Sequence, residues 1–232
     1  MNSKPCSDYK QAINRNHRDC VVKFDCNKAL EHACCVGNLE MVKFLTNLPQ
    51  VDPGFDKNIS VHSAARYGHL DVIKYMAKLD SVSMVDESCT ICVASYFGQL
   101  DIVKYLAEFD QEYPSIRDNC VIIVASENGF LDIVKFLATC SGVNAGDQDN
   151  EALKEAAKYG HLEIVEFLTT LPEVDISDDG YDAIYAAASC RHHDVVEFLL
   201  SKVKDEDTVS DIRKQIDENN LKYEQIAAAL GL

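Results

Sequence analysis

No stretch of this 232-residue sequence approaches the run of about 18 apolar residues that a membrane-spanning helix needs. The first 20 residues also lack the apolar core of a signal peptide. We therefore expect an intracellular protein that neither spans a membrane nor is secreted through a classical signal peptide.

Basic side chains are few, with 22 Lys and Arg against 38 Asp and Glu and a net charge of -16. Such a charge repels the nucleic-acid backbone and anionic lipid, so neither nucleic acid nor membrane is expected as a partner. The acid is concentrated in residues 144–218, with 19 acidic and 7 basic side chains. A solvated outer face and a footprint for a basic partner both fit this concentration.

Catalytic motifs are also missing. The sequence has no Gly-rich phosphate loop, no Gly-x-Ser-x-Gly elbow and no His-Glu-x-x-His helix. No nucleophile and base stand at a recognisable spacing. We therefore predict no enzymatic activity and no cofactor.

The 10 cysteines do not recur in register, and the chain is too long for a small disulfide scaffold. We expect reduced thiols and a cytoplasmic or nuclear location. Cys89 and Cys92 form the one Cys-x-x-Cys pair, and Cys190 lies close to His192 and His193. Neither group offers the four ligands of a structural zinc site, so no metal is predicted.

The sequence does contain a motif that occurs six times, for example as GHLDVIKYM and GFLDIVKFL. Successive copies begin 31, 30, 31, 31 and 31 residues apart, at Gly37, Gly68, Gly98, Gly129, Gly160 and Arg191. A fixed period of this size indicates stacked supersecondary units, which usually form a binding surface without a catalytic pocket.

Each copy predicts two helices. Small residues three and four positions before the Gly and an aliphatic residue seven before it give a short helix with one apolar face. Aliphatics at plus four, five and eight and an aromatic at plus seven give a second helix, whose aromatic we assign to the core. The residue at the Gly position joins the two helices and is expected to have positive φ, which strains Arg191.

These residues resemble the ankyrin repeat, whose unit is about 33 residues long. The resemblance covers residues 25–204, although the family's Thr-Pro-Leu-His opening is lost and only His62 keeps its histidine. It implies an all-α, ankyrin-type solenoid of six helix-turn-helix repeats. We predict one continuous domain, with an N-terminal cap at 1–24 and a C-terminal cap of two further helical stretches at 205–232. Residues 7–15 are expected to form a helix within the first cap.

Among the six repeats, the two residues before the Gly position vary most. In the resembled family these positions face a concave groove that binds partners. This implies a protein-binding site formed by two cations and four aromatic residues: Arg66, Tyr67, Tyr96, Phe97, Lys158 and Tyr159. Tyr and Arg are the usual anchors of interfaces. The competing interpretation is that these rings only cover the seam between helices. The loop tips at Asp56, Asp86, Asp118, Asp149 and Asp179 are the next most variable surface.

The sequence therefore predicts a monomeric scaffold or adaptor that holds an unknown partner protein in its groove. A structural or self-assembling module and a thiol- or metal-responsive regulator are the alternatives. Light scattering separates the first alternative from the scaffold, and elemental analysis tests the second.

Overall fold

The computed structural model describes residues 6–83, 89–109, 116–177 and 181–230, and every regular element within them is a helix. The chain divides into two compact units, Met1–Tyr113 and Pro114–Leu232, which we describe separately. The all-α repeat architecture is confirmed, whereas the prediction of one continuous domain stays a prediction. Asp86 and Asp179 lie outside the described residues, as does the side chain of Asp118.

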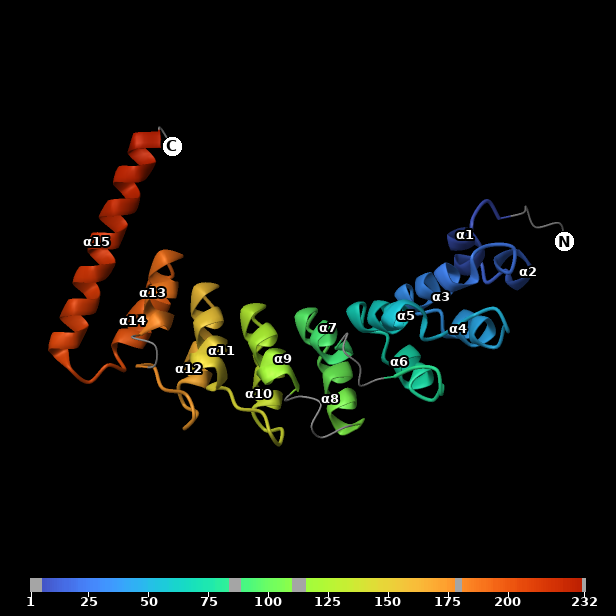
Figure 1. Ribbon diagram of the computed structural model, residues 1–232, viewed down its shortest axis with the longest axis horizontal. Helices are drawn as coiled ribbons and strands as arrows, with labels where there is room; N and C mark the ends of the chain where they lie inside the picture. The colour runs from blue at the N-terminus through green and yellow to red at the C-terminus, as the bar shows by residue number, and fades with distance from the viewer. Residues whose placement is uncertain (1–5, 84–88, 110–115, 178–180, 231–232) are drawn as a thin grey trace. The chain divides into compact units, whose positions relative to one another are not determined.

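The first unit consists of helix pairs joined by tight turns. In Figure 1, α3, α5 and α7 lie next to one another in one row, and α4, α6 and α8 form a second row. The helices of this unit are α1 (Tyr9–Asn14), α2 (Arg18–Val21), α3 (Cys26–Cys35), α4 (Leu39–Thr46), α5 (Phe55–Arg66), α6 (Leu70–Met76), α7 (Thr90–Tyr96) and α8 (Leu100–Phe109).

The second unit repeats the arrangement and adds a long last helix that packs against α13 (Figure 1). Its helices are α9 (Ile116–Glu127), α10 (Leu131–Leu137), α11 (Asp147–Lys158), α12 (Leu162–Leu168), α13 (Asp182–Ser189), α14 (His193–Leu200) and α15 (Glu206–Leu230).

The turn inside each pair has the predicted backbone. All five repeat glycines have positive φ, between 69° and 80°, and Arg191 takes φ 63° at the same position. Gly160 shows a second requirement, because a Cβ there would lie 2.4 Å from Nδ1 of His192 in the next repeat. This second requirement does not apply to Arg191, which is exposed. After its repeat the chain continues as α15, and no further repeat of the same pattern places a side chain over Arg191.

Replacing Arg191 by glycine is expected to stabilise the second unit. A non-glycine residue in the left-handed region costs about 1–2 kcal/mol, whereas glycine adds entropy to the unfolded chain and gives part of this back. The free energy of unfolding in urea should therefore rise by up to about 1 kcal/mol. A measured decrease would mean that contacts of the Arg191 side chain outweigh the backbone strain.

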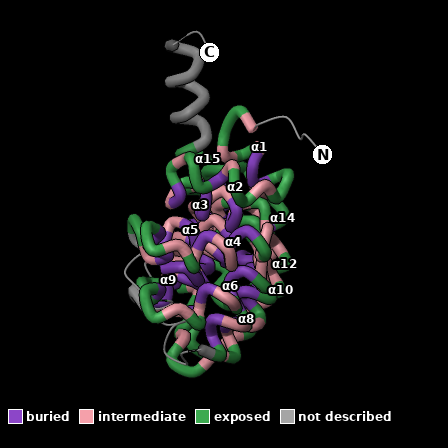
Figure 2. The backbone as a smooth tube through the Cα atoms, turned by 90° about the vertical axis from the view of Figure 1, so that its right-hand side faces the viewer, coloured by how far each residue is buried: buried purple, intermediate pink, exposed green. Residues whose placement is uncertain are grey.

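The core lies within and between the helix pairs (Figure 2). The predicted aliphatics seven residues before each turn are all buried, with exposures of 0–1%: Leu30, Val61, Ile91, Ile122, Leu153 and Ile184. The small residues three and four before the turn are buried as well, so neighbouring first helices approach closely. On the second helices, the residues at plus four, five and eight fill the core.

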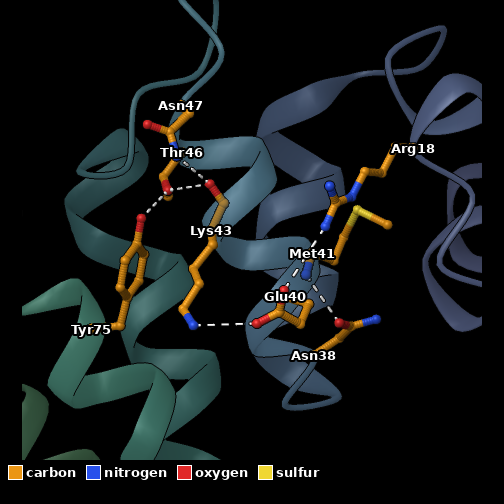
Figure 3. Close-up of polar contacts among 8 residues, drawn as sticks. All are labelled: Arg18, Asn38, Glu40, Met41, Lys43, Thr46, Asn47 and Tyr75. Carbon is orange, nitrogen blue, oxygen red and sulfur yellow. Dashed lines mark hydrogen bonds and ion pairs between the residues drawn. The ribbon is translucent and has the colours of Figure 1, made fainter.

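The plus-seven aromatics are an exception, and their assignment to the core was wrong. All six are half-buried: Phe44, Tyr75, Tyr105, Phe136, Phe167 and Phe198. Three of these rings, those of Tyr75, Tyr105 and Phe167, contact polar side chains of a neighbouring second helix. Tyr75 on α6 shares a 2.8 Å hydrogen bond with Thr46 on α4 (Figure 3). Lys74 and Lys135 lie over the rings of Tyr105 and Phe167 in the following repeats.

Polar contacts on the same side join α2 and α4. The Glu40 carboxylate lies 3.3 Å from Lys43 and 3.9 Å from Arg18, and the Asn38 side chain accepts from the backbone N–H of Met41 at 3.0 Å (Figure 3). These ion pairs are exposed and stabilise the unit only weakly. The Asn38 cap satisfies one of the free N–H groups at the start of α4.

A buried asparagine ten residues before the turn holds the loop of the next repeat. Asn58, Asn119 and Asn150 are 3–6% exposed and have positive φ. The Asn150 amide donates to the carbonyl of Asp175 at 3.0 Å and accepts from its N–H at 3.3 Å. The partners of all three asparagines lie 25 residues away, in loops whose course the sequence does not predict.

Both caps differ in part from the predictions. The helix expected at 7–15 is α1, but its turn continues into α2, so the first unit begins with a shortened repeat. Asn16, with φ 55°, takes the place of the glycine in this turn. The two helical stretches expected near the C-terminus are one helix, α15. It is attached to the repeats through buried Ile212 and through Arg213, which lies 2.7–2.8 Å from Glu197.

Candidate functional site

The candidate residues stand where the first helices end. Arg66 and Tyr96 are the last residues of α5 and α7, and Tyr67 and Phe97 cap them. The small residues one turn earlier face the neighbouring helices, so these end positions point away from the core. The residues Tyr67, Tyr96 and Phe97 are accordingly 50%, 49% and 37% exposed.

Four of the six candidates form one contiguous group, which we call the Arg66 cluster: Arg66, Tyr67, Tyr96 and Phe97. The Arg66 guanidinium lies 5.4 Å from the centre of the Tyr67 ring and 4.7 Å from that of Phe97. Tyr96 meets Phe97 edge-on at 4.9 Å. The guanidinium thus links the ends of α5 and α7 through cation–π contacts. No carboxylate among the described residues forms an ion pair with it.

Lys158 and Tyr159 belong to the second unit and form a pair of their own at the end of α11. Tyr159 is 47% exposed, and the Lys158 ammonium lies 5.2 Å from its ring centre. Lys158 is also 2.8 Å from Glu155, and this hydrogen bond raises the pKa of the ammonium. Because an acid of its own helix partly neutralises it, Lys158 is a weaker anchor for an anion than Arg66.

A hollow of about 210 Å³ adjoins the Arg66 cluster. Residues of α1, α3 and α5 line it, among them Lys10, Lys28, Glu31, His32, Arg66 and Tyr67. Burial, followed by the charge of Lys10, lowers the pKa of His32, which keeps that ring neutral at neutral pH. Lys28 lies 3.9 Å from Asp25, whereas Lys10 and Arg66 form no ion pair with a described carboxylate, so these two cations suit the hollow to an anionic group.

The hollow could not be predicted from the repeat pattern, because that pattern does not show that α1 packs against α3. The turn at Asn16 precedes Gly37 by 21 residues and contains no glycine, so it fits neither the period nor the motif of the six repeats. The Asn-His-Arg-Asp sequence around this turn is the one signal that could have revealed it.

The prediction that all cysteines are reduced was wrong for one pair. Cys89 and Cys92 are joined by a disulfide and are not the reduced thiols that we predicted. Cys89 is the N-cap of α7, and one helical turn brings the two Cα atoms to 5.3 Å, within the range that a disulfide bridges. Among the described free cysteines, Cys34 is fully buried, and burial raises the pKa of its thiol, which makes it unreactive.

The second suspected cluster does not assemble. Among the described residues, Cys190, His192 and His193 do not bring their ligand atoms together. The His192 ring instead covers Gly160 of the preceding repeat. Within the described part of the chain, no helix is both long enough and apolar enough to cross a membrane.

Alanine at Tyr96 or Phe97 is expected to leave the fold almost unchanged. Both rings are largely exposed, and the seam beneath them is filled by buried Ala94 and Ser95. The free energy of unfolding should change by less than about 1 kcal/mol, as for other surface substitutions. Thermal melting checks this before any binding study, because a larger loss would assign the rings to the seam between helices.

Comparison with known proteins agrees with this architecture. The sequence model described as ankyrin repeats (3 copies) matches residues 30–119, 62–149 and 122–211. The crystal structure of the human ASB11 ankyrin repeat domain superposes with a TM-score of 0.61 at 20% identity, covering 74% of this chain and 82% of that one. No curated protein matches.

The chain therefore belongs to the ankyrin-repeat family. Ankyrin repeats generally mediate protein–protein interactions, and the fold is typically non-enzymatic. This agrees with the class of partner predicted from the sequence.

Proposed function

We propose that this protein is a non-enzymatic, monomeric scaffold that binds a partner protein through the Arg66 cluster. The observation that carries the proposal is the Arg66 guanidinium between two half-exposed rings, 4.7 and 5.4 Å from their centres. Such an arrangement holds large apolar surface and an unneutralised charge in a fixed position before any partner arrives. Rigid aromatic and arginine anchors of this kind dominate binding energy in protein interfaces.

The chemistry of the surface favours a partner segment that is both acidic and apolar. An apolar or aromatic side chain would lie against Tyr67 and Phe97, and a carboxylate would reach Arg66 or the hollow with Lys10 and Lys28. Lys158 and Tyr159 offer a second, weaker contact in the other unit. This first-unit surface carries cations although the chain as a whole is acidic. The cytoplasmic or nuclear location stays a prediction.

Selection of displayed random peptides on the immobilised full chain tests the proposal without a known partner. Peptides that bind should carry Asp or Glu next to aliphatic or aromatic residues. Arg66→Glu should weaken the selected peptides by about 2 kcal/mol, or roughly 30-fold in Kd. The loss should shrink in high salt, because salt screens the repulsion between the new carboxylate and the peptide.

Two results would contradict the proposal. Peptides without acidic residues would remove the role of Arg66, and an unchanged Kd for Arg66→Glu would place the binding surface elsewhere. Light scattering on the same preparation should give the mass of one chain, because a larger assembly would favour the self-assembling alternative.

A further inference from the structure

Three metal-ligating side chains meet at the shortened repeat that begins the first unit. The ligand atoms of Cys6, His17 and Cys20 all lie within 4.8 Å of one another, and the Cys6 sulfur is 3.3 Å from Nδ1 of His17. All three residues are half-buried, so a small ion can reach them from solvent. The residues come from the segment before α1, from the turn and from α2.

The repeat architecture explains why the His17 ring is available. His17 follows the positive-φ residue Asn16, and its N–H bonds to the carbonyl of Ala12 at 2.8 Å, as that of His69 does to Ala64. His17 is therefore in the same register as His69 and His161. Those rings use Nε2 to bond a backbone carbonyl of the preceding repeat, at 3.0 and 2.9 Å. Among the described residues no repeat precedes α1, and the His17 ring faces Cys6 instead.

Packing of the repeat does not explain the two cysteines either. Cys20 stands four residues after Asn16, a position that holds a buried Met, Val or Ile in the six repeats: Met41, Val72, Ile102, Ile133, Ile164 and Val195. In this unit a thiol replaces the aliphatic side chain. Cys6 precedes Asp8, the N-cap of α1, and reaches back across the turn to His17.

We propose that Cys6, His17 and Cys20 bind one zinc ion, with water as the fourth ligand. Two thiolates and an imidazole are the ligands that zinc prefers. In a tetrahedral site with Zn–S of about 2.3 Å and Zn–N of about 2.0 Å, sulfur and nitrogen ligands stand roughly 3.5–3.8 Å apart. The three side chains already lie near this spacing. Each thiol gives its proton to solvent as it binds the ion.

Zinc at this place would fasten a small structural element. Helices α1 and α2 have only six and four residues, and their described buried side chains are Ala12, Ile13 and Val21. Such a small element gains from a metal cross-link. The ion would connect the segment before α1 to α2 and so hold the wall that contributes Tyr9 and Lys10 to the hollow.

The test uses the full chain, stripped of metal and kept under a phosphine reductant, with zinc as the probe. Elemental analysis after dialysis should give one zinc per chain, and cobalt in its place should show a sulfur-to-metal charge-transfer band. Cys6→Ser and His17→Ala should each lower zinc affinity by at least about 100-fold, since even residues behind a zinc ligand are worth 10–100-fold. Zinc should raise the melting temperature of the unaltered chain but not that of Cys6→Ser or His17→Ala.

Matched cysteine variants provide the controls. Cys190→Ser removes an exposed thiol in the second unit, and Cys92→Ser removes one member of the other group of three cysteines, Cys89, Cys92 and Cys120, whose disulfide the reductant opens. Neither change should alter the zinc content, and a loss of zinc in Cys92→Ser would assign the ion to that other group. Circular dichroism verifies that each variant keeps its helices. Zinc retained by Cys6→Ser, or none bound by the unaltered chain, would overturn the proposal. A Cys6–Cys20 disulfide in protein prepared with reductant, seen as the loss of two hydrogens in the joined peptide, would also overturn it.

Discussion

Replacing Leu137 by alanine should destabilise the protein by about 2–5 kcal/mol, the cost of a cavity in a packed core. Leu137 is fully buried at the plus-eight position of α10, which packs against both α9 and α12. The neighbouring Phe136 is half-buried, so Phe136→Ala should cost less, about 1–2 kcal/mol, although a larger side chain is removed. Urea unfolding followed by circular dichroism measures both, because the chain has no tryptophan.

The order of the two losses is the informative result. Each repeat contacts mainly its neighbours, so a cavity in one repeat also weakens the interfaces with the adjacent repeats. If Phe136→Ala cost as much as Leu137→Ala, the aromatic stripe would belong to the core after all. In that case the aromatic residues of α10, α12 and the corresponding helices would face the core.

Replacing Asn150 by alanine should cost about 2–4 kcal/mol. The change removes two hydrogen bonds that hold Asp175, each worth roughly 0.5–1.5 kcal/mol, and forces alanine into a backbone with φ 60° at about 1 kcal/mol more. The site is 4% exposed, so water does not replace the lost partners easily. Thermal and urea unfolding of the full chain should both report the loss.

Two further variants separate the contributions at this site. Asn150→Gly accepts the positive φ and loses only the hydrogen bonds, so it should cost less than Asn150→Ala. Asn27→Ala alters the same repeat position in the first unit, where the side chain accepts one 3.2 Å bond from Asp52 and φ is not positive. Its cost should stay below about 1 kcal/mol. Equal losses for Asn27→Ala and Asn150→Ala would show that the burial, the second hydrogen bond and the positive φ of Asn150 add nothing to stability.

The periodic features of the fold were predictable because each follows from local sequence. A glycine at a fixed interval marks the turn, and the small residues before it mark the side where helices approach. The half-buried state of Phe136 could not be predicted in this way. A helical pattern shows which residues share a stripe, but an edge between helices and a core between them give the same stripe.

Other features depend on partners that are far away in sequence or on a substituted signal. Asn150 reads as a turn residue until the loop at Asp175 is placed beside it. Asn16 replaces a glycine, so the first repeat is not recognised, and with it the hollow and the neighbourhood of Cys6 are missed. Asn219 and Asn220 interrupt the apolar pattern of α15 without ending the helix, because asparagine costs only a fraction of a kcal/mol in a helix interior.

For the candidate site, the sequence identified the exposed rings at the helix ends but not their arrangement. The resemblance to ankyrin repeats assigned six residues to one surface. The structure groups three of them around Arg66 and assigns Lys158, already paired with Glu155, to the other unit. Which charges are neutralised locally depends on side-chain contacts that a repeat pattern does not contain.

The most direct test of the proposed binding surface compares Phe97→Ala with Phe55→Ala in titrations of one selected peptide. Phe55 is a matched control, because it is 49% exposed and begins α5, at the opposite end from Arg66. We predict that Phe97→Ala weakens binding by about 30-fold and Phe55→Ala leaves it unchanged. Weaker binding in Phe55→Ala alone would contradict this account and move the partner to the loop tips beside Asp56.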